Sequence, residues 1–389
     1  MNIYLDNSAT TKICPESLRK YIEASEGDFG NPSSLHAMGV NAEKTLDAAR
    51  REILNSVRDT QSRVVFTASG SEANNLAIIG RALSKDRYRK GAKIITTDSE
   101  HASVSSPLAK LKEMGFNVVN ISTRGGIIDT DELRRELNEN VILVTVMMVN
   151  NETGALYDIP TVSRLMRELC PDSYLHVDAT QSYLKVPFTK KGIGADMITV
   201  SSHKIEGPKG IGALIIDPAV IKARGLSPIV MGGGQELGLR SGTENVPAAA
   251  AFGEAVRIGY ANIGTHFDKT SSLREYLIEK IKSNAALADL SITNPENHAP
   301  HILNITLPKI KSETMLHYLS SVGIFVSSGS ACSSNSAHKS SALVAYGRTP
   351  EEADCSLRIS FSHRNEPSDV DALCDALASG ISRLARIRR

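Results

Sequence analysis

The chain has 389 residues, of which 41% are hydrophobic and 22% charged, and its formal net charge is +1. This composition is typical of a globular enzyme, and the near-neutral charge argues against a nucleic-acid binder or a protein of the membrane surface. No apolar run approaches the roughly 20 residues that span a bilayer, and the N-terminus lacks the layout of a signal peptide, so we expect a cytoplasmic protein. The five cysteines are scattered and odd in number, which is typical of reduced thiols and argues against a disulfide framework, and no metal site is expected.

Strand-like and helical patterns alternate along the first part of the chain. Strands are expected at 3–5, 63–67, 93–97, 117–121, 141–149, 174–177, 195–200 and 212–216. Helices are expected at 15–25, at 35–57 with Ser33 or Ser34 as its cap, and at 70–83, 102–114, 130–137 and 160–169. Apolar strands separated by helices indicate an α/β fold whose mostly parallel sheet is covered on both faces.

The strand at 63–67 turns directly into a helix, and Gly70 and Ser71 lie where that helix begins. Backbone N–H groups without an acceptor and the positive end of the helix dipole meet at such a point, which suits a phosphate group. Taken alone, this sequence is more commonly a simple helix cap. It therefore needs support from the rest of the chain.

Polar side chains follow the carboxyl ends of three further strands. His101 follows one, Asn151 follows the next, and Asp178 and Gln181 follow the third. Because ligands of such sheets bind at the carboxyl ends of the strands, we expect these side chains to share one site. Each alone would be interpreted as a helix cap or turn former. Together they supply the polar contacts that a planar, anionic nitrogen heterocycle requires.

A further strand end carries Ser201, His203 and Lys204 in a turn rich in glycine and proline. An amine just past a buried strand is partly desolvated, which disfavours the ammonium and lets the amine bind an aldehyde as a Schiff base. A lone lysine in such a loop is usually an ordinary surface residue. Together with the polar residues at the other strand ends, however, the chain offers one partner for each functional group of pyridoxal phosphate. We therefore predict that Lys204 binds that cofactor.

The pattern changes after the last strand of this series. A Gly-rich loop at 231–245 precedes one long helical pattern from Val246 to about Lys282, and a smaller α+β unit follows. Its expected strands are 302–308, 323–327 and 357–362, and its expected helices are 313–322 and 368–384. We therefore predict a large cofactor-binding domain over 16–258 and a small domain formed by 1–15 and 259–389.

The segment 327–341, SSGSACSSNSAHKSS, has eight serines among its fifteen residues and no large apolar side chain. Such a segment cannot pack into a core, and we expect a mobile loop. A cysteine in such a loop is unusual because free cysteines are normally buried. Cys332 is either a tolerated surface thiol or a reactive one that reaches a pocket elsewhere, and the second interpretation accounts better for its placement.

A series of motifs runs through the chain in the order LDNSATT, NPSSLH, GSEANN, SEH, VNNETG, HVDATQS, SSHKIEGPKGIGAL, GGGQELGLRSGTENV and SSGSACSS. In this order and spacing the chain resembles, over nearly its whole length, the cysteine desulfurases of the NifS/IscS group. These are fold-type-I enzymes, with a seven-stranded, mostly parallel sheet in a large domain and a smaller α+β domain. Two positions depart from the family pattern: Glu206, where an aromatic residue or histidine is usual, and Leu237, where arginine is usual.

The resemblance implies a role for each residue around pyridoxal 5′-phosphate. Lys204 would form the Schiff base, Asp178 would pair with the ring nitrogen and preserve the ring as an electron sink, and Gln181 would hydrogen-bond the ring hydroxyl. His101 would stack on the ring and assist proton transfer. The phosphate would be held by Gly70, Ser71, Ser201, His203 and, from the second subunit of a homodimer, Thr243.

The same resemblance implies the substrate and the products. Asn151 and Arg358 would bind the carboxylate of L-cysteine, and Cys332 would take up its sulfur as a persulfide while L-alanine is released. The sulfur would then pass to an acceptor protein for iron–sulfur cluster assembly or tRNA thiolation. No direct contact with nucleic acid or membranes is implied.

Two alternatives stay open at this point. A selenocysteine lyase or a cysteine C–S lyase on the same scaffold would not need Cys332. A catalytically silent pyridoxal-binding protein would have no reason to keep Lys204, Asp178, His101 and Cys332 together.

Overall fold

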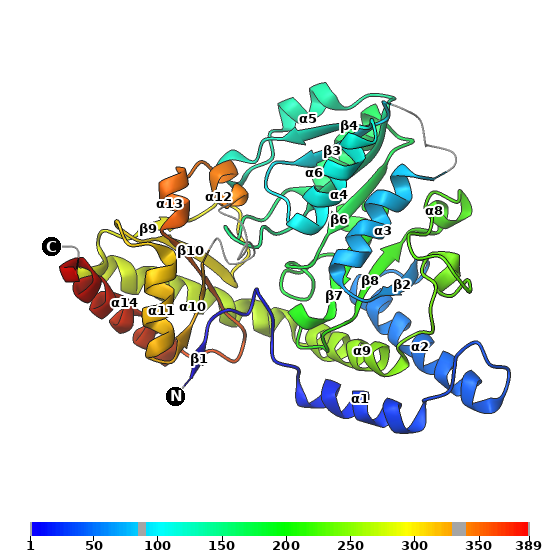
Figure 1. Cartoon of the computed structure of the whole chain (residues 1–389), viewed down its shortest axis with the longest axis horizontal. Coiled ribbons are helices and arrows are strands. Elements are labelled where there is room, and N and C mark those ends of the chain that lie inside the picture. Colours follow the sequence, from blue (N-terminus) through cyan, green and yellow to red (C-terminus); the bar gives the residue numbers. More distant parts are fainter. Residues whose placement is uncertain (1, 85–90, 329–339, 388–389) are drawn as a thin grey trace.

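The computed structural model describes residues 2–84, 91–328 and 340–387 (Figure 1). A seven-stranded sheet forms the centre of the larger unit, in the order β2-β8-β7-β6-β5-β3-β4. Its strands are β2 (Arg63–Thr67), β3 (Lys93–Thr97), β4 (Asn117–Ile121), β5 (Val141–Met147), β6 (Tyr174–Asp178), β7 (Met197–Ser201) and β8 (Gly212–Ile216). Only β8 runs antiparallel to its neighbours, so the predicted α/β fold with a mostly parallel sheet is confirmed.

Helices cover both faces of this sheet. Alternate residues of a strand point to opposite faces, so Ile95 of β3 packs with the helices of one face and Ile94 with those of the other. The first face carries α2 (Ala37–Ser56), α5 (Thr130–Glu136), α6 (Ile159–Leu169) and α9 (Val246–Ala261). The second carries α3 (Gly70–Ala82), α4 (Ala102–Glu113) and α8 (Pro218–Lys222), while α1 (Pro15–Gly27) packs against α9 and α7 (Lys190–Ile193) is a single turn.

The smaller unit has its own sheet and its own apolar cluster. Its antiparallel sheet, in the order β12-β13-β10-β9, consists of β9 (Ser291–Thr293), β10 (Ile302–Thr306), β12 (Ser327–Ser328) and β13 (Ser356–Ser360). Around it lie α10 (Ile263–Ser283), α11 (Ser312–Ser321), α12 (Ser341–Tyr346), α13 (Pro350–Asp354) and α14 (Pro367–Ile387). The N-terminal strand β1 (Ile3–Tyr4) pairs with β11 (Ile324–Phe325), and Leu5 belongs to this second cluster.

Several expectations about these elements were wrong. The single helix from Val246 to about Lys282 is two helices, because Asn262 ends α9 and begins α10, consistent with the preference of asparagine for helix ends. The cap of α2 is His36, whose Nδ1 accepts the N–H of Gly39 at 3.3 Å, and not Ser33 or Ser34. The single strand expected at 323–327 is two strands, β11 and β12, which belong to different sheets. The short elements α7, α8, β9, α12 and α13 were not foreseen.

The predicted boundary after residue 258 falls inside the last turn of α9, and the division into two domains stays a prediction. Across residues 2–84, 91–328 and 340–387, no helix is long and apolar enough to cross a membrane.

Candidate active site

A cavity of about 430 Å³ opens at the carboxyl ends of the central strands, facing the smaller unit. Most residues predicted for the site line this one cavity, namely Gly70, Ser71, His101, Asn151, Asp178, Gln181, Ser201, His203, Lys204 and Arg358. Thr243 does not, because it lines a separate cavity with Thr67 and Asn245. Cys332 lies outside the described residues.

Lys204 enters the cavity from a short 3-10 turn that directly follows β7. Its Nζ donates to two carbonyl oxygens of the N-terminal segment, at 2.7 Å to Ser8 and 2.8 Å to Ala9. The turn needs glycine at position 207, because a Cβ there would lie 2.1 Å from the Oγ of Ser202. The close approach of Gly207 to Ser202 therefore helps to hold the turn that carries Lys204.

Asp178 lies at the carboxyl end of β6, and both of its carboxylate oxygens are held. Oδ2 accepts the Nδ2 of Asn74 at 2.8 Å, and Oδ1 accepts the backbone N–H of Thr180 at 2.9 Å. Asn74 comes from α3, so this helix orients the acid from the face of the sheet. Asp178 is 5% exposed and lines the cavity, where its carboxylate can pair with a protonated ring nitrogen.

His101 caps α4 and lines the same cavity. Its Nδ1 accepts the N–H of Ser103 at 3.1 Å, so in the neutral ring the proton lies on Nε2. Burial lowers the pKa of His101, with Lys204 and Arg358 acting in the same direction and Asp178 opposing them. The neutral ring is therefore the form that can stack on a flat ligand and exchange a proton near pH 7.

The start of α3 forms the part of the cavity that suits a phosphate group. Ser69 caps the helix by accepting the N–H of Glu72 at 3.2 Å, and the N–H groups of Gly70 and Ser71 have no acceptor within the helix. A Cβ at Gly70 would lie 3.1 Å from the Cβ of Ser201. Glycine thus keeps the helix start close to β7 and leaves its N–H groups open to the cavity.

Arg358 reaches the cavity from β13 of the smaller unit. Its Nη2 pairs with Asp6 at 2.9 Å, and its Nη1 donates to the backbone carbonyl of Asn151 at 3.0 Å. Within the described part of the chain its Nε has no partner. The residue is 5% exposed, so a carboxylate ligand would meet a largely desolvated cation.

The contribution of the N-terminal segment was not predicted from the sequence. Asp6 and Ser8 line the cavity, and the buried hydroxyl of Ser8 has no partner among the residues that are described. The signal was present, because a run of small polar residues directly follows the strand at 3–5, much as polar residues follow the five strand ends that were identified. Asn74 was likewise missed, although it lies one turn into the helix whose start was identified.

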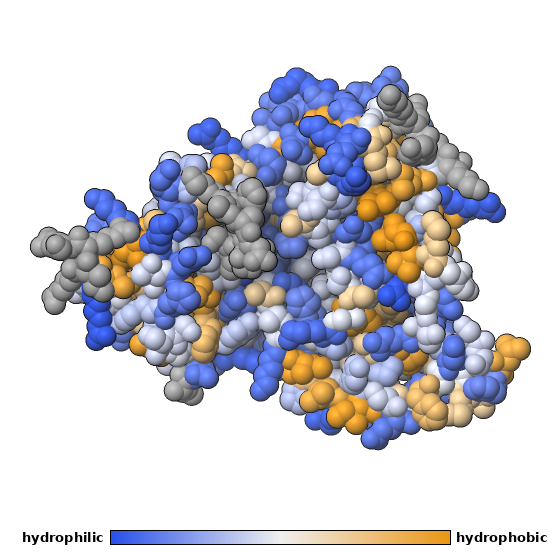
Figure 2. Space-filling model, viewed as in Figure 1, coloured by the Kyte–Doolittle hydropathy of each residue, from blue (hydrophilic) through white to orange (hydrophobic). Residues whose placement is uncertain are grey.

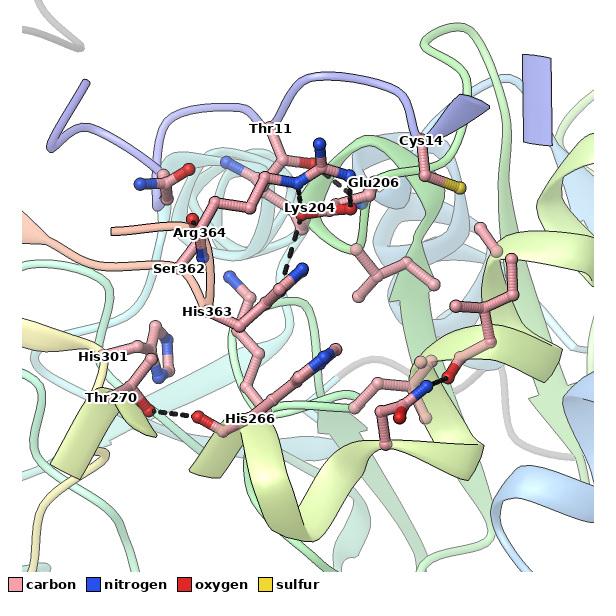
Figure 3. Close-up of a pocket in the computed structure, with 18 of the residues that line it drawn as sticks. Thr11, Cys14, Lys204, Glu206, His266, Thr270, His301, Ser362, His363 and Arg364 are labelled. Atoms are coloured by element: carbon pink, nitrogen blue, oxygen red, sulfur yellow. Dashed lines mark hydrogen bonds and ion pairs between the residues drawn. The ribbon is translucent and has the colours of Figure 1, made fainter. Parts of the chain in front are cut away.

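A second cavity, also of about 430 Å³, lies beside the first, and Lys204 lines both (Figure 3). Here Glu206 forms a two-point ion pair with Arg364, with Glu206 oxygens 3.0 Å from Nε and 2.6 Å from Nη2. The Nδ1 of His363 is 3.7 Å from Glu206, and the rings of His363 and His266 stack with centroids 3.8 Å apart. The unusual Glu206 therefore links the Lys204 turn to the smaller unit.

Comparison with known proteins identifies the family. The family model for class-V aminotransferases matches residues 3–373, so the chain belongs to that family. Within it the chain belongs to the NifS/IscS group, which the motifs had indicated. It is 38% identical to a "NifS/IcsS protein homolog" of Lactobacillus delbrueckii subsp. bulgaricus, covering 95% of this chain and 94% of the relative. It is 36% identical to "Cysteine desulfurase IscS 1" of Archaeoglobus fulgidus, covering 98% and 97%.

Two solved structures share this architecture. A "NifS-like protein" superposes with a TM-score of 0.90 at 29% identity, covering 98% of this chain and 100% of that one. A structure described as "SspA in complex with cysteine" superposes with a TM-score of 0.78 at 31% identity, covering 92% and 98%.

Proposed function

We propose that this protein is a cysteine desulfurase that uses pyridoxal 5′-phosphate, taking sulfur from L-cysteine and releasing L-alanine. The observation that carries the proposal is that the Lys204 amine, the Asp178 carboxylate and the start of α3 line one cavity. The names of the relatives and the cysteine-bound neighbour support the same activity.

The residues of the cavity fit the cofactor. An amine, a buried and anchored carboxylate, and a helix start with open N–H groups correspond to its aldehyde, ring nitrogen and phosphate, and the Ser8 hydroxyl is a buried polar group without a partner in the described chain. Lys204 would bind the aldehyde, Asp178 the ring nitrogen, Gln181 the ring hydroxyl, and His101 would stack on the ring. The phosphate would be held by Gly70, Ser71, Ser201 and His203, with Thr243 of a second copy. When bound, the cofactor supplies an electron sink that stabilises negative charge on the α-carbon of the substrate.

The side chains of this protein then have distinct tasks. Arg358 and Asn151 bind the substrate carboxylate and so orient the α-carbon. Lys204 and His101, both at the cavity, accept and return protons. The Cys332 thiolate attacks the substrate sulfur: an S–S bond forms, the C–S bond breaks with its electron pair staying on carbon, and protonation of that carbon leads to L-alanine.

A homodimer is part of the proposal, because Thr243 does not line the cavity that needs it within one copy. Large apolar side chains are exposed near α1 and α2 and in the Gly-rich loop, including Leu35 at 98%, Met231 at 80% and Phe29 at 67%. Figure 2 shows apolar surface along the edge formed by α1 and α2. A second copy of the chain is the occupant we propose for this surface. The sulfur-acceptor protein and the cytoplasmic location stay predictions.

The test is release of alanine and sulfide from L-cysteine in the presence of a thiol reductant. The wild type should form both, and Cys332→Ala should lose both while keeping its bound cofactor. Lys204→Ala should lose the adduct that borohydride traps on a tryptic peptide of the wild type. Pyruvate and ammonia in place of alanine, unchanged in Cys332→Ala, would identify a lyase and refute the proposal.

A further inference from the structure

A second lysine, Lys185, is connected to Lys204 through hydrogen bonds. Its Nζ donates to the Oε1 of Gln181 at 3.4 Å, and the Nε2 of Gln181 donates to the carbonyl of Ser8 at 2.9 Å. The same carbonyl accepts the Nζ of Lys204 at 2.7 Å. The two lysine side chains thus lie at the two ends of one short chain of polar groups.

Lys185 also lines the second cavity, together with Lys204. In the part of the chain that the structure describes, Lys185 forms no ion pair with a carboxylate, so its charge is not compensated by direct contact. Burial lowers the pKa of Lys185 to about 7, with Lys204 and Arg358 acting in the same direction and Glu206 opposing them. The titratable and charged groups that face it from the neighbouring elements are Lys204, Arg358, Glu206, His203 and His301.

We propose that Lys185 is a positioning residue for the candidate active site: it orients the Gln181 carboxamide and, through its positive charge, disfavours the protonated form of the nitrogen of Lys204. This inference rests on the proposed function, because it concerns the nitrogen that binds the cofactor.

The orienting effect follows from the two ends of the carboxamide. With Oε1 held by Lys185, the amide presents its NH₂ group toward Ser8 and the cavity, and an NH₂ group is the donor that a phenolate-like ring oxygen needs. Rotation of the amide would place Oε1 against the Ser8 carbonyl, oxygen against oxygen. The Lys185 ammonium and the Ser8 carbonyl therefore favour the same one of the two orientations.

The electrostatic effect follows from like charges. A cation next to an amine favours the neutral form of that amine, which is one way in which proteins activate lysine nucleophiles. Because the two nitrogens interact, they titrate as a pair: when the nitrogen of Lys204 loses its proton, Lys185 holds its own more firmly. The pair thus keeps one positive charge near the site while leaving the reactive nitrogen neutral.

The test is a pH titration of the visible absorption of the cofactor in the purified holoenzyme, whose midpoint reports the nitrogen of Lys204. Lys185→Met should raise this midpoint by about one pH unit, because the neighbouring positive charge is gone. Lys185→Gln should raise it equally, since it keeps an amide donor for Gln181 but no charge, and Lys185→Arg should restore the wild-type midpoint. Cofactor retention after gel filtration should fall in Lys185→Met more than in Lys185→Gln.

Lys12→Met is the matched control, since Lys12 is exposed on the N-terminal segment and lines neither cavity. Its midpoint should equal that of the wild type, and thermal melting should show each variant folded. If Lys185→Met and Lys185→Gln titrate as the wild type does, Lys185 has no such role. If the wild type shows no visible absorption that Lys204→Ala abolishes, the proposed function itself fails.

Discussion

At the scale of single residues, His176 shows how a buried side chain supports the site from behind. It precedes Asp178 on β6 and points to the same face of the sheet. Its Nδ1 is 2.8 Å from the hydroxyl of Thr145 and its Nε2 is 2.9 Å from the hydroxyl of Thr199. Burial lowers the pKa of His176 to about 4, so the ring stays neutral and ties β5, β6 and β7 together.

This depressed pKa has a consequence for stability. The unfolded histidine takes up a proton near pH 6.5, whereas the folded one does so only near pH 4, so stability falls as the pH falls through this window. His176 should account for a loss of about 2 kcal/mol between pH 7 and pH 5. His176→Gln, which cannot titrate, should show a correspondingly smaller loss in urea unfolding midpoints at these two pH values.

His317→Gln is the control, because His317 is exposed on α11 and its replacement should leave the pH dependence unchanged. His203 and His301 also have lowered pKa values and contribute to the slope in every variant. An equal loss of stability in His176→Gln and in the wild type would contradict the prediction.

At the scale of elements, the large unit follows closely from its sequence. Apolar strand patterns and capped helices gave most boundaries within a few residues, and the parallel order then placed His101, Asn151, Asp178 and Lys204 at one edge. The contacts of the N-terminal segment could not be derived this way. Asp6 is held by Arg358, a residue from the far end of the chain, and local patterns carry no information about such pairing.

The position of α3 relative to the sheet depends on Gly212 in β8. A Cβ at this position would lie 2.6 Å from the carbonyl carbon of Ser69 and 2.7 Å from the nitrogen of Gly70, both backbone atoms. Gly212→Ala should therefore push the start of α3 away from the cavity. We expect a loss of about 1–3 kcal/mol in stability and a larger loss of bound cofactor, measured by thermal melting and by absorbance after gel filtration.

Gly264→Ala provides the matched comparison. Gly264 lies in α10, where an added Cβ meets nothing within 4 Å, so this change should stabilise the protein by about 0.4–1 kcal/mol. Full cofactor retention in Gly212→Ala would show that the start of α3 does not hold the phosphate.

At the scale of the whole molecule, the exposed apolar edge and the position of Thr243 outside the candidate site both bear on the proposed homodimer. Leu35 and Phe29 lie before α2, and Arg50 of α2 pairs with Glu236 of the Gly-rich loop at 2.9 Å. This ion pair holds the Gly-rich loop, which carries Thr243, against α2. The apolar edge lies next to the same helix. One contact between two copies could then bury the edge and bring Thr243 to the second copy.

Leu35→Arg should convert the proposed dimer into a monomer, because a charge in the centre of an apolar contact is desolvated without a partner. The side chain is 98% exposed, so the fold of one copy should be unaffected. Sedimentation velocity measures the outcome, and Met114→Arg, at a 43% exposed position on the end of α4, should remain a dimer. A dimeric Leu35→Arg would place the contact elsewhere.

The N-terminal segment also ties completion of the site to completion of translation. Asp6 is synthesised early, but its partner Arg358 lies 352 positions further along the chain. The ion pair can form only after those residues have been added. At roughly 5–20 residues per second, this takes roughly 20–70 s. Until then, the smaller unit that anchors the N-terminal segment is incomplete. The carbonyl of Ser8 is therefore not yet held in the position where it accepts the amine of Lys204. A chain that terminates between Lys204 and Arg358 would thus carry the lysine but not the finished pocket, so such truncated products should not retain the cofactor.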